Sequence, residues 1–364
     1  MNGLKNIFAG RWGIIGVGAV IGILAPLLQK FGNPGNMGIC VACFERDIAG
    51  ALGLHRAAVV QYMRPEIIGF VLGSLLAAYL FKEFRARAGS APIVRFVLGV
   101  FAMIGALVFL GCPWRTLLRL AGGDGNAILG LLGLIFGIWI GTLFFRGGYN
   151  LGRSQPTLTP VGWILPLIMM GFLFLRIIFP PLEGQESSGV LLYSAKGPGA
   201  MHAPLVMSLI AGVAVGFLAQ RSRFCTMGAF RDLILFRQLH LFSGVVALIV
   251  AAFIMNMILG QFHPGFQNQP IAHTMGLWNF SGMALAGLAF ALAGGCPGRQ
   301  LFLAGEGDGD AAIFVLGMIV GAAFAHNFGL ASSPQGIGPH GIAAVVVGIF
   351  VCLFIGGTMR NKVA

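Results

Sequence analysis

Charged residues are scarce in this chain. Asp, Glu, Lys and Arg make up 9% of its 364 residues, whereas hydrophobic residues make up 57%. A chain with so little polar surface cannot cover a water-soluble globule, and its apolar stretches approach the length that crosses a lipid bilayer. The short alternating strands of a transmembrane barrel are also missing from the sequence. The composition therefore predicts an all-α polytopic membrane protein.

Acidic residues are the scarcer of the two charge types. Asp and Glu number 11 against 23 Lys and Arg, which gives a formal net charge of +12 at pH 7. In a soluble protein such an excess would suggest a nucleic-acid partner. Here the basic residues cluster between apolar runs, where they act as topology signals. We therefore expect a lipid bilayer, and no nucleic acid, as the surroundings of this chain.

Cysteine is infrequent and does not follow the pattern of a disulfide scaffold. The seven histidines show no metal-like spacing with the cysteines, so the sequence predicts no metal site and no cofactor. A Cys-x-x-Cys pair is present once, and its second cysteine is replaced by glycine in the later copy of that motif. The cysteines are Cys40, Cys43, Cys112, Cys225, Cys296 and Cys352.

Apolar runs recur along the whole chain, and several are shorter than the ~20 residues that a full crossing prefers. The first run lacks a small-residue cleavage site behind it and is interpreted as a retained span. We expect about 8–10 transmembrane helices together with short re-entrant half-helices that carry cysteines. The runs lie near residues 12–29, 65–81, 93–110, 127–145, 161–179, 203–219, 241–259, 279–294, 310–325 and 341–357.

Two motifs occur twice. "GCPWRTLLRLAGGDGNA" begins at Gly111 and "GCPGRQLFLAGEGDGDA" at Gly295, and nine of their seventeen positions agree, where chance would give about two. "CVACFERD" and "CTMGAFRD" share the pattern Cys-x5-Arg-Asp. Because the two motifs are 72 residues apart in the first half and 71 in the second, the whole half is duplicated. The chain divides into repeats at 1–180 and 203–364, joined by an external linker at 181–202.

The distribution of basic residues predicts that the two repeats have opposite orientations. The loops at 260–278 and 326–340 contain no Lys or Arg, whereas Arg221, Arg223 and Arg237 fall between other spans of the second half. Each span of that half then runs opposite to its counterpart, as in the inverted repeats of many transporters. Both chain termini are expected on the cytoplasmic side.

The Gly-Cys-Pro step is expected to end a helix, because proline removes a backbone donor and restricts the residue before it. A new half-helix would begin after Pro113 and Pro297, and the tips that carry Cys112 and Cys296 would meet within the membrane. A helix N-terminus offers free N–H groups and a partial positive charge to a small anion. Thiols beside it suit a soft sulfur or selenium atom.

Arginines in the two motifs supply positive charge. Arg115 and Arg299 follow the Gly-Cys-Pro cysteines, and Arg46 and Arg231 belong to the Cys-x5-Arg-Asp motifs. For the first two, ion pairs with Asp124 and Asp308 and direct contact with a substrate both remain open. These two aspartates are also expected to form turns or helix caps.

One cluster of basic residues does not follow the rule that Lys and Arg concentrate in cytoplasmic loops. It lies on the side that this topology makes external. Two interpretations remain open: ion pairing with nearby acidic residues, or an exposed basic mouth that gathers anions. The basic residues are Lys30, Arg46, Arg56 and Arg64, and the acidic ones are Glu45, Asp47 and Glu66.

The duplicated motifs resemble those of the YeeE/YedE sulfur-transport family of bacterial inner-membrane proteins, and "RSRFCTMGAFRDL" from Arg221 to Leu233 carries the family's signature. The doubled Gly-Cys-Pro form resembles its YedE subgroup, which is linked to selenium. The resemblance implies uptake of thiosulfate or a selenium anion along a path lined by Cys40, Cys112, Cys225 and Cys296. It also implies transfer of that cargo to a small cytoplasmic sulfur- or selenium-carrier protein.

These observations predict a multi-pass transporter of the bacterial inner membrane and not an enzyme. Two other functions remain open. One is a membrane thiol oxidoreductase that uses Cys40 and Cys43, and the other is a generic small-anion channel of the formate or nitrite kind.

Overall fold

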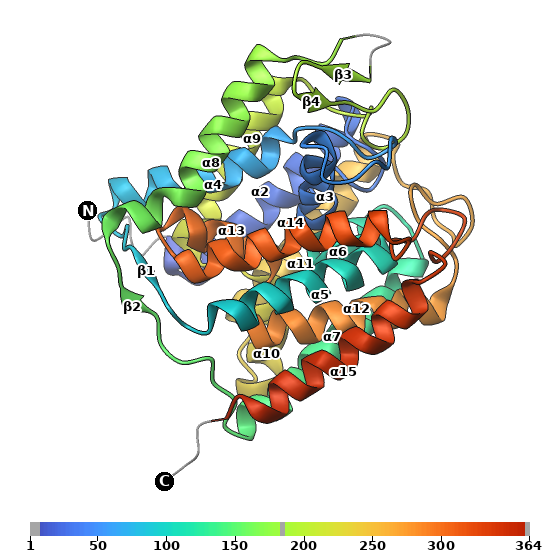
Figure 1. Cartoon of the computed structure of the whole chain (residues 1–364). Coiled ribbons are helices and arrows are strands. Elements are labelled where there is room, and N and C mark those ends of the chain that lie inside the picture. The colour runs from blue at the N-terminus through green and yellow to red at the C-terminus, as the bar shows by residue number, and fades with distance from the viewer. Residues whose placement is uncertain (1–7, 183–185, 361–364) are drawn as a thin grey trace.

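The computed structural model describes residues 8–182 and 186–360, and these residues are almost entirely helical (Figure 1). The first half contains α2 (Arg11–Lys30), α3 (Val41–Ala51), α4 (Pro65–Leu80), α5 (Pro92–Phe109), α6 (Pro113–Ala121), α7 (Asn126–Arg146) and α8 (Thr159–Ile178). The second contains α9 (Leu205–Ser222), α10 (Thr226–Phe236), α11 (His240–Ile258), α12 (Gly276–Ala293), α13 (Pro297–Gly305), α14 (Gly309–Asn327) and α15 (Gly341–Thr358).

Two small antiparallel strand pairs connect some of these helices. β1 (Arg87–Ala88) pairs with β2 (Gln155–Pro156), and β3 (Ser187–Ser188) pairs with β4 (Leu191–Leu192). In Figure 1, β1 and β2 lie at the left of the helices and β3 and β4 at the upper right. The strand pairs are therefore minor additions to an all-α fold.

Each predicted apolar run lies in a helix, with ends that differ by about three residues or fewer. Within the described residues, nine helical segments are long and apolar enough to cross a membrane, and three of these join two consecutive helices across a break: Pro92–Ala121, Leu205–Phe236 and Gly276–Gly305. The prediction of an all-α polytopic membrane protein with about 8–10 spans is confirmed. The chain termini, which we predicted to be cytoplasmic, lie outside the described residues.

The order of helices in the first half recurs in the second. The short helices α3 and α10 have 11 residues each, and α6 and α13 have nine each. Contacts between the halves are reciprocal: α2 packs on α11 as α9 packs on α4, and α5 packs on α14 as α12 packs on α7. The outer helices differ, since α8 packs on α4 whereas α15 packs on α12.

Glycine allows the closest approach between the halves. A Cβ atom on Gly105 of α5 would lie 2.5 Å from the carbonyl oxygen of Gly282 on α12. Small residues at such crossings let the backbones of membrane helices come into direct contact, where van der Waals packing replaces the hydrophobic effect. This crossing holds the helices that precede α6 and α13 together.

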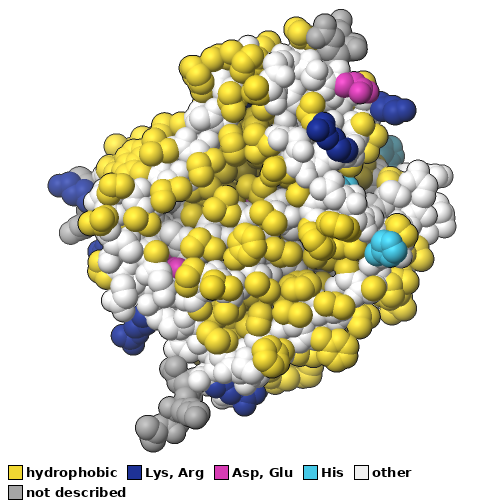
Figure 2. Space-filling model, in the orientation of Figure 1, with side chains coloured by type: hydrophobic (Ala, Val, Ile, Leu, Met, Phe, Trp, Pro, Cys, Tyr) yellow, Lys and Arg dark blue, Asp and Glu magenta, His cyan; other side chains and the backbone are white. Residues whose placement is uncertain are grey.

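The outer surface is strongly apolar. Figure 2 shows one face covered with hydrophobic side chains, with most of its Lys and Arg side chains near the edge. Large side chains project from this surface, among them Ile93 at 79% exposure and Phe354 at 70%. In water this would be an unusually large apolar patch, whereas in a bilayer it faces lipid.

Candidate functional site

Four cysteines stand directly before the four short helices. Cys40 precedes α3, Cys112 precedes α6, Cys225 precedes α10 and Cys296 precedes α13, each in an extended backbone conformation. Proline occupies the first helical position of α6 and α13, where its missing N–H is not needed. The predicted helix starts at Pro113 and Pro297 are confirmed.

The four sulfur atoms form two pairs. The Sγ atoms of Cys40 and Cys112 are 3.8 Å apart, and those of Cys225 and Cys296 are 3.7 Å apart. We expect the tips that carry Cys112 and Cys296 to meet, and the close sulfur contacts among the described residues lie within each half. Each Gly-Cys-Pro cysteine instead meets the cysteine of the other motif in its own half, because α3 and α10 also begin at the centre of the fold.

Each thiol pair lies where two helix N-termini converge. The backbone N–H of Cys43 donates to Cys40 Sγ at 3.4 Å, and that of Gly228 donates to Cys225 Sγ at 3.3 Å. The cysteine therefore takes the capping position that Ser or Asp usually fills. Partial positive charges of two helix ends at one place favour an anion or a thiolate.

An aromatic cluster lies between α6 and α13. Trp114 packs on Phe70, Phe224 and Phe302, with ring centroids 5.7, 5.8 and 6.1 Å apart. Its indole also approaches Gly298, where an added Cβ would lie 3.2 Å from Trp114 Cζ2. Phe224 directly precedes Cys225, and Trp114 comes two residues after Cys112, so aromatic rings separate the two thiol pairs.

This aromatic cluster was not predicted, although the sequence contains a signal for it. Trp114 and Gly298 occupy the same place in the two Gly-Cys-Pro motifs. A large side chain opposite glycine in a duplicated segment predicts that one copy fills the space that the other leaves. The other three aromatic residues have no such signal, because their neighbours depend on the tertiary packing.

Arg115 lies beside the first thiol pair and is fully buried. Its Nη1 is 3.9 Å from Cys43 Sγ and also donates to the Leu110 carbonyl. Further bonds go to the carbonyl oxygens of Asn36 at 3.2 Å, Pro270 at 3.1 Å and Ile271 at 3.2 Å. Backbone carbonyls thus replace the acidic partner that a buried guanidinium ordinarily needs.

The predicted ion pair between Arg115 and Asp124 is wrong. Asp124 instead binds Arg119 at 2.6 Å and accepts from the backbone N–H of Asn126 at 2.9 Å. Arg119 points toward Asp124 because both stand at the far end of α6, whereas Arg115 lies one turn nearer to Cys112. The predicted turn or cap role of Asp124 is confirmed.

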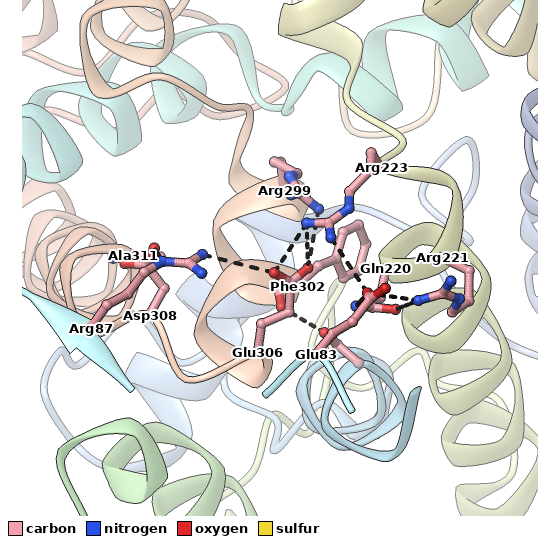
Figure 3. Close-up of polar contacts among 11 residues, drawn as sticks. Glu83, Arg87, Gln220, Arg221, Arg223, Arg299, Phe302, Glu306, Asp308 and Ala311 are labelled. Carbon is pink, nitrogen blue, oxygen red and sulfur yellow. Dashed lines mark hydrogen bonds and ion pairs between the residues drawn. The ribbon is translucent and has the colours of Figure 1, made fainter. Parts of the chain in front are cut away.

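Arg299 lies beside the second thiol pair, and its partner is Glu306, not Asp308 as we predicted. The Arg299–Glu306 distance is 3.6 Å, and Arg223 and Arg87 approach the same carboxylate at 3.2 and 3.8 Å. In Figure 3, Glu306 lies between Arg87 on one side and Arg223 and Arg299 on the other. Asp308 is held away by Arg87 at 2.7 Å.

Asp308 has the cap role that we predicted for it. Its side chain accepts from the backbone N–H of Ala311 at 3.0 Å at the start of α14. The capping geometry turns this carboxylate toward β1 and Arg87. Because Asp308 is turned toward Arg87, Arg299 pairs with Glu306.

Glu83 extends this network toward α9. It accepts from Gln220 at 3.1 Å and pairs with Arg221 at 2.7 Å and Arg223 at 3.4 Å. Burial alone would raise the pKa of Glu83, but the bond from Gln220 and the two arginine charges outweigh it and hold the pKa below its usual value. Glu83 therefore stays charged.

The two Arg-Asp motifs form the same local ion pair in different surroundings. Arg46 binds Asp47 at 2.7 Å in the buried interior, and Arg231 binds Asp232 at 2.8 Å with 32% of the arginine exposed. Arg64 also binds Asp47 at 2.7 Å. Because Asp47 neutralises Arg46 and Arg64, these two residues do not contribute free positive charge to an exposed basic mouth.

Among the described residues, the other acidic side chains near this cluster form no ion pair with an arginine. Glu66 accepts from Asn33 at 2.8 Å, and both carboxylate oxygens of the fully buried Glu45 lack a hydrogen-bond partner. Lys30 and Arg56 are exposed. The ion-pair interpretation of the cluster is thus confirmed for Asp47 alone.

No group of three His, Cys, Asp or Glu side chains that could hold a metal ion occurs within residues 8–182 and 186–360. All six cysteines are reduced and buried. Cys352 lies in α15 and contacts neither thiol pair, in keeping with its place outside the duplicated motifs.

Comparison with known proteins concerns mainly the second half. Residues 221–356 match the family model described as sulphur transport. Over this segment the chain is similar to the sulphur-transport family. It holds Cys225, Cys296 and the signature Arg231–Asp232, so the family resemblance drawn from the sequence is confirmed.

Two relatives that are similar to part of this chain bear the name thiosulfate transporter TsuA. The relative from Spirochaeta thermophila is 33% identical over 99 residues, which are 27% of this chain and 29% of the relative. The relative from Escherichia coli is 31% identical over 108 residues, which are 29% of this chain and 30% of the relative. The matched stretches therefore span less than a third of either relative.

Mild oxidation of the protein is expected to form two disulfides, Cys225–Cys296 before Cys40–Cys112. In each pair the sulfur atoms need to approach by about 1.7 Å to reach bonding distance. Cys225 is 6% exposed, whereas Cys40 and Cys112 are fully buried, so the oxidant reaches the second pair first. Peptide mass spectrometry after brief treatment with copper phenanthroline measures both bonds. A Cys40–Cys43 disulfide as the main product would contradict this order.

Proposed function

We propose that this protein is a transporter, and not an enzyme, that takes up a small sulfur- or selenium-containing anion across the bacterial inner membrane. Two relatives named thiosulfate transporters support a thiosulfate-like substrate. Selenium anions remain in the proposal because of the doubled Gly-Cys-Pro motif. The path would pass Cys40, Cys112, Cys225 and Cys296.

One observation carries this proposal. Buried thiols meet in pairs at 3.8 and 3.7 Å, each at two converging helix N-termini. A thiol is a weak donor and a soft acceptor, so a pair can contact sulfur or selenium atoms while the helix ends balance the negative charge. A site that binds only hard anions, whose contact atoms are oxygen, would not require cysteine sulfur atoms.

The duplication fits the same proposal. We propose inverted repeats at 1–180 and 203–364 with an external linker at 181–202, both termini on the cytoplasmic side. The reciprocal packing of α2 on α11 and of α9 on α4 supports this arrangement. Alternating access would then exchange equivalent contacts between the halves around the fixed thiols.

A small cytoplasmic sulfur- or selenium-carrier protein is the proposed recipient. Arg87 and Arg223, with 28% and 50% of their side chains exposed, lie on the side of the second thiol pair. Such exposed arginines can attract an acidic partner or hold an anion before release.

Uptake into proteoliposomes tests the proposal. The purified protein is expected to import labelled thiosulfate, and alanine at each of the four pathway cysteines is expected to lower the rate about tenfold or more, the effect of losing a hydrogen bond to a charged group. Cys352→Ala is the matched control, because that thiol is equally buried but contacts neither pair. Sulfide, selenite and selenide complete the panel.

Two outcomes would replace this proposal. Transport of formate or nitrite that survives all four substitutions would identify a generic anion channel. Redox turnover through a Cys40–Cys43 disulfide, with no net transport, would identify a thiol oxidoreductase.

A further inference from the structure

Polar side-chain atoms without hydrogen-bond partners gather around the second thiol pair. Four belong to residues within four positions of Cys225 or Cys296, and the fifth belongs to Trp114, which reaches the same place from α6. These buried atoms are Ser222 Oγ, Thr226 Oγ1, Arg299 Nη1, Gln300 Oε1 and Trp114 Nε1. Leaving a buried donor or acceptor unpaired is costly, so such a gathering indicates a place for a polar ligand.

Two counterparts of these residues beside the first thiol pair are bonded to backbone carbonyls. Arg115, the counterpart of Arg299, donates to backbone carbonyls of Asn36, Pro270 and Ile271. Thr116, the counterpart of Gln300, donates to the Cys112 carbonyl oxygen at 3.1 Å. Arg115 and Thr116 are therefore already bonded, whereas their counterparts Arg299 and Gln300 each have an unpaired atom.

The indole of Trp114 packs against Gly298, two residues after Cys296 of the second pair. Atoms Cζ2 and Cε2 are the part of its ring nearest to Gly298, at 3.2 and 3.5 Å from the place of an added Cβ. Nε1 is bonded to Cε2, so the edge that carries the free N–H faces the start of α13. Trp114 is 1% exposed, which excludes bulk water as the partner of this donor.

Two further donors flank the pair. Thr226 is fully buried and is the first residue of α10, directly after Cys225. Arg299 is the third residue of α13, and its contact with Glu306 at 3.6 Å is longer than a normal hydrogen bond to nitrogen. A guanidinium held this loosely can turn one N–H toward a ligand and keep its ionic partner.

The second pair is also nearer to the surface. Cys225 is 6% exposed and Cys40, Cys112 and Cys296 are fully buried. Arg299 adjoins Arg223, whose side chain is 50% exposed. Figure 3 shows these two arginines side by side at Glu306, so ion-paired arginines connect the exposed Arg223 with Arg299 beside the second pair.

We propose that the second thiol pair is the binding site of the transporter, and that it holds a small sulfur oxoanion by both ends. The soft sulfur atom contacts Cys225 and Cys296. The oxygen atoms accept hydrogen bonds from Trp114 Nε1, Thr226 Oγ1 and Arg299. This inference rests on the proposed function, and it assigns selectivity for an oxoanion over hydrosulfide to the three oxygen-binding donors.

Binding of thiosulfate and of hydrosulfide to the purified full-length protein tests the inference by calorimetry. Thr226→Val removes one donor and keeps the shape of the side chain, and Trp114→Phe removes one donor and keeps a smaller aromatic ring. Each is expected to raise the Kd for thiosulfate about tenfold and to leave the Kd for hydrosulfide unchanged, because hydrosulfide has no oxygen atoms. Arg299→Lys is a third variant with the charge retained.

Thr116→Val and Trp163→Phe are the matched controls. The Thr116 hydroxyl is already bound within α6, and Trp163 packs on Tyr79 and Phe84 away from both pairs. Both controls are expected to bind thiosulfate as the wild type does. Equal elution volume and thermal midpoint are required of every variant that is compared.

The outcomes separate the two proposals. If the wild type imports thiosulfate but Trp114→Phe and Thr226→Val bind it normally, the site is wrong and the transport function stands. If the variants lose thiosulfate and hydrosulfide binding alike, the donors do not form hydrogen bonds to the oxygen atoms of thiosulfate, and the inference fails. If thiosulfate binds through these donors but never crosses the membrane, the site stands and the transport function fails.

Discussion

Replacing Asp47 with asparagine is expected to lower the free energy of unfolding by about 3–5 kcal/mol. This carboxylate binds Arg46 and Arg64, both at 2.7 Å, and the three side chains are at most 2% exposed. Asparagine has nearly the same shape but no charge, so two buried guanidinium groups lose their counter-ion. Arg64 keeps its bonds to the Pro198 and Met201 carbonyls, whereas the side-chain hydrogen bonds of Arg46 go to Asp47.

The duplicated motif supplies a control for this prediction. Asp232→Asn makes the same change in the second copy, where Arg231 is 32% and Asp232 18% exposed. An ion pair in contact with solvent contributes about 0–1 kcal/mol. Denaturant titration in mixed micelles measures both variants. Equal losses for the two aspartates would show that burial does not set the strength of the motif.

Replacing Gly38 with alanine is expected to displace Cys40 and to destabilise the protein by about 1–3 kcal/mol. The segment between α2 and α3 turns back along α2, so that a Cβ on Gly38 would lie 1.7 Å from the carbonyl oxygen of Ala25 and 2.5 Å from its carbonyl carbon. Both atoms are backbone and cannot rotate away. The segment must therefore move, and Cys40 is only two residues further on.

Selective loss of one disulfide reports this displacement. After oxidation, Gly38→Ala is expected to form less Cys40–Cys112 bond and an unchanged amount of Cys225–Cys296 bond. Gly16→Ala is the control, since nothing lies within 4 Å of the added methyl group. In an exposed helical position, alanine stabilises by up to about 1 kcal/mol over glycine. A normal yield of both disulfides in Gly38→Ala would mean that the loop accommodates the methyl group without moving the thiol.

Much of the fold could be predicted because each long helix consists of one apolar run between turn residues. Leu205–Ser222 and Gly341–Thr358 are examples in which the run and the helix nearly coincide. The helix starts at Pro113 and Pro297 were also predictable, since the effect of proline on its own backbone is local. The cap formed by Asp308 was predictable for the same reason, because its carboxylate accepts from a backbone N–H only three residues further on.

The partners of charged side chains were not predictable in the same way. Arg115 and Arg299 occupy equivalent places in the two motifs, yet one binds backbone carbonyls and the other binds Glu306. A long guanidinium side chain reaches many atoms, and the loops that supply its acceptors come from distant parts of the chain. Pro270 and Ile271, for example, are 155 and 156 residues away from Arg115.

The sequence by itself determined the membrane character, the duplication and the positions of the four cysteines. Composition and the length of the apolar runs indicate the membrane, and the repeated motifs with their equal spacing indicate the duplication. Only the tertiary structure decided that Cys40 meets Cys112 and Cys225 meets Cys296, and that Trp114 fills the space above Gly298. These contacts join helices that are far apart in the chain. Their geometry depends on how closely whole helices pack, which no short stretch of residues encodes.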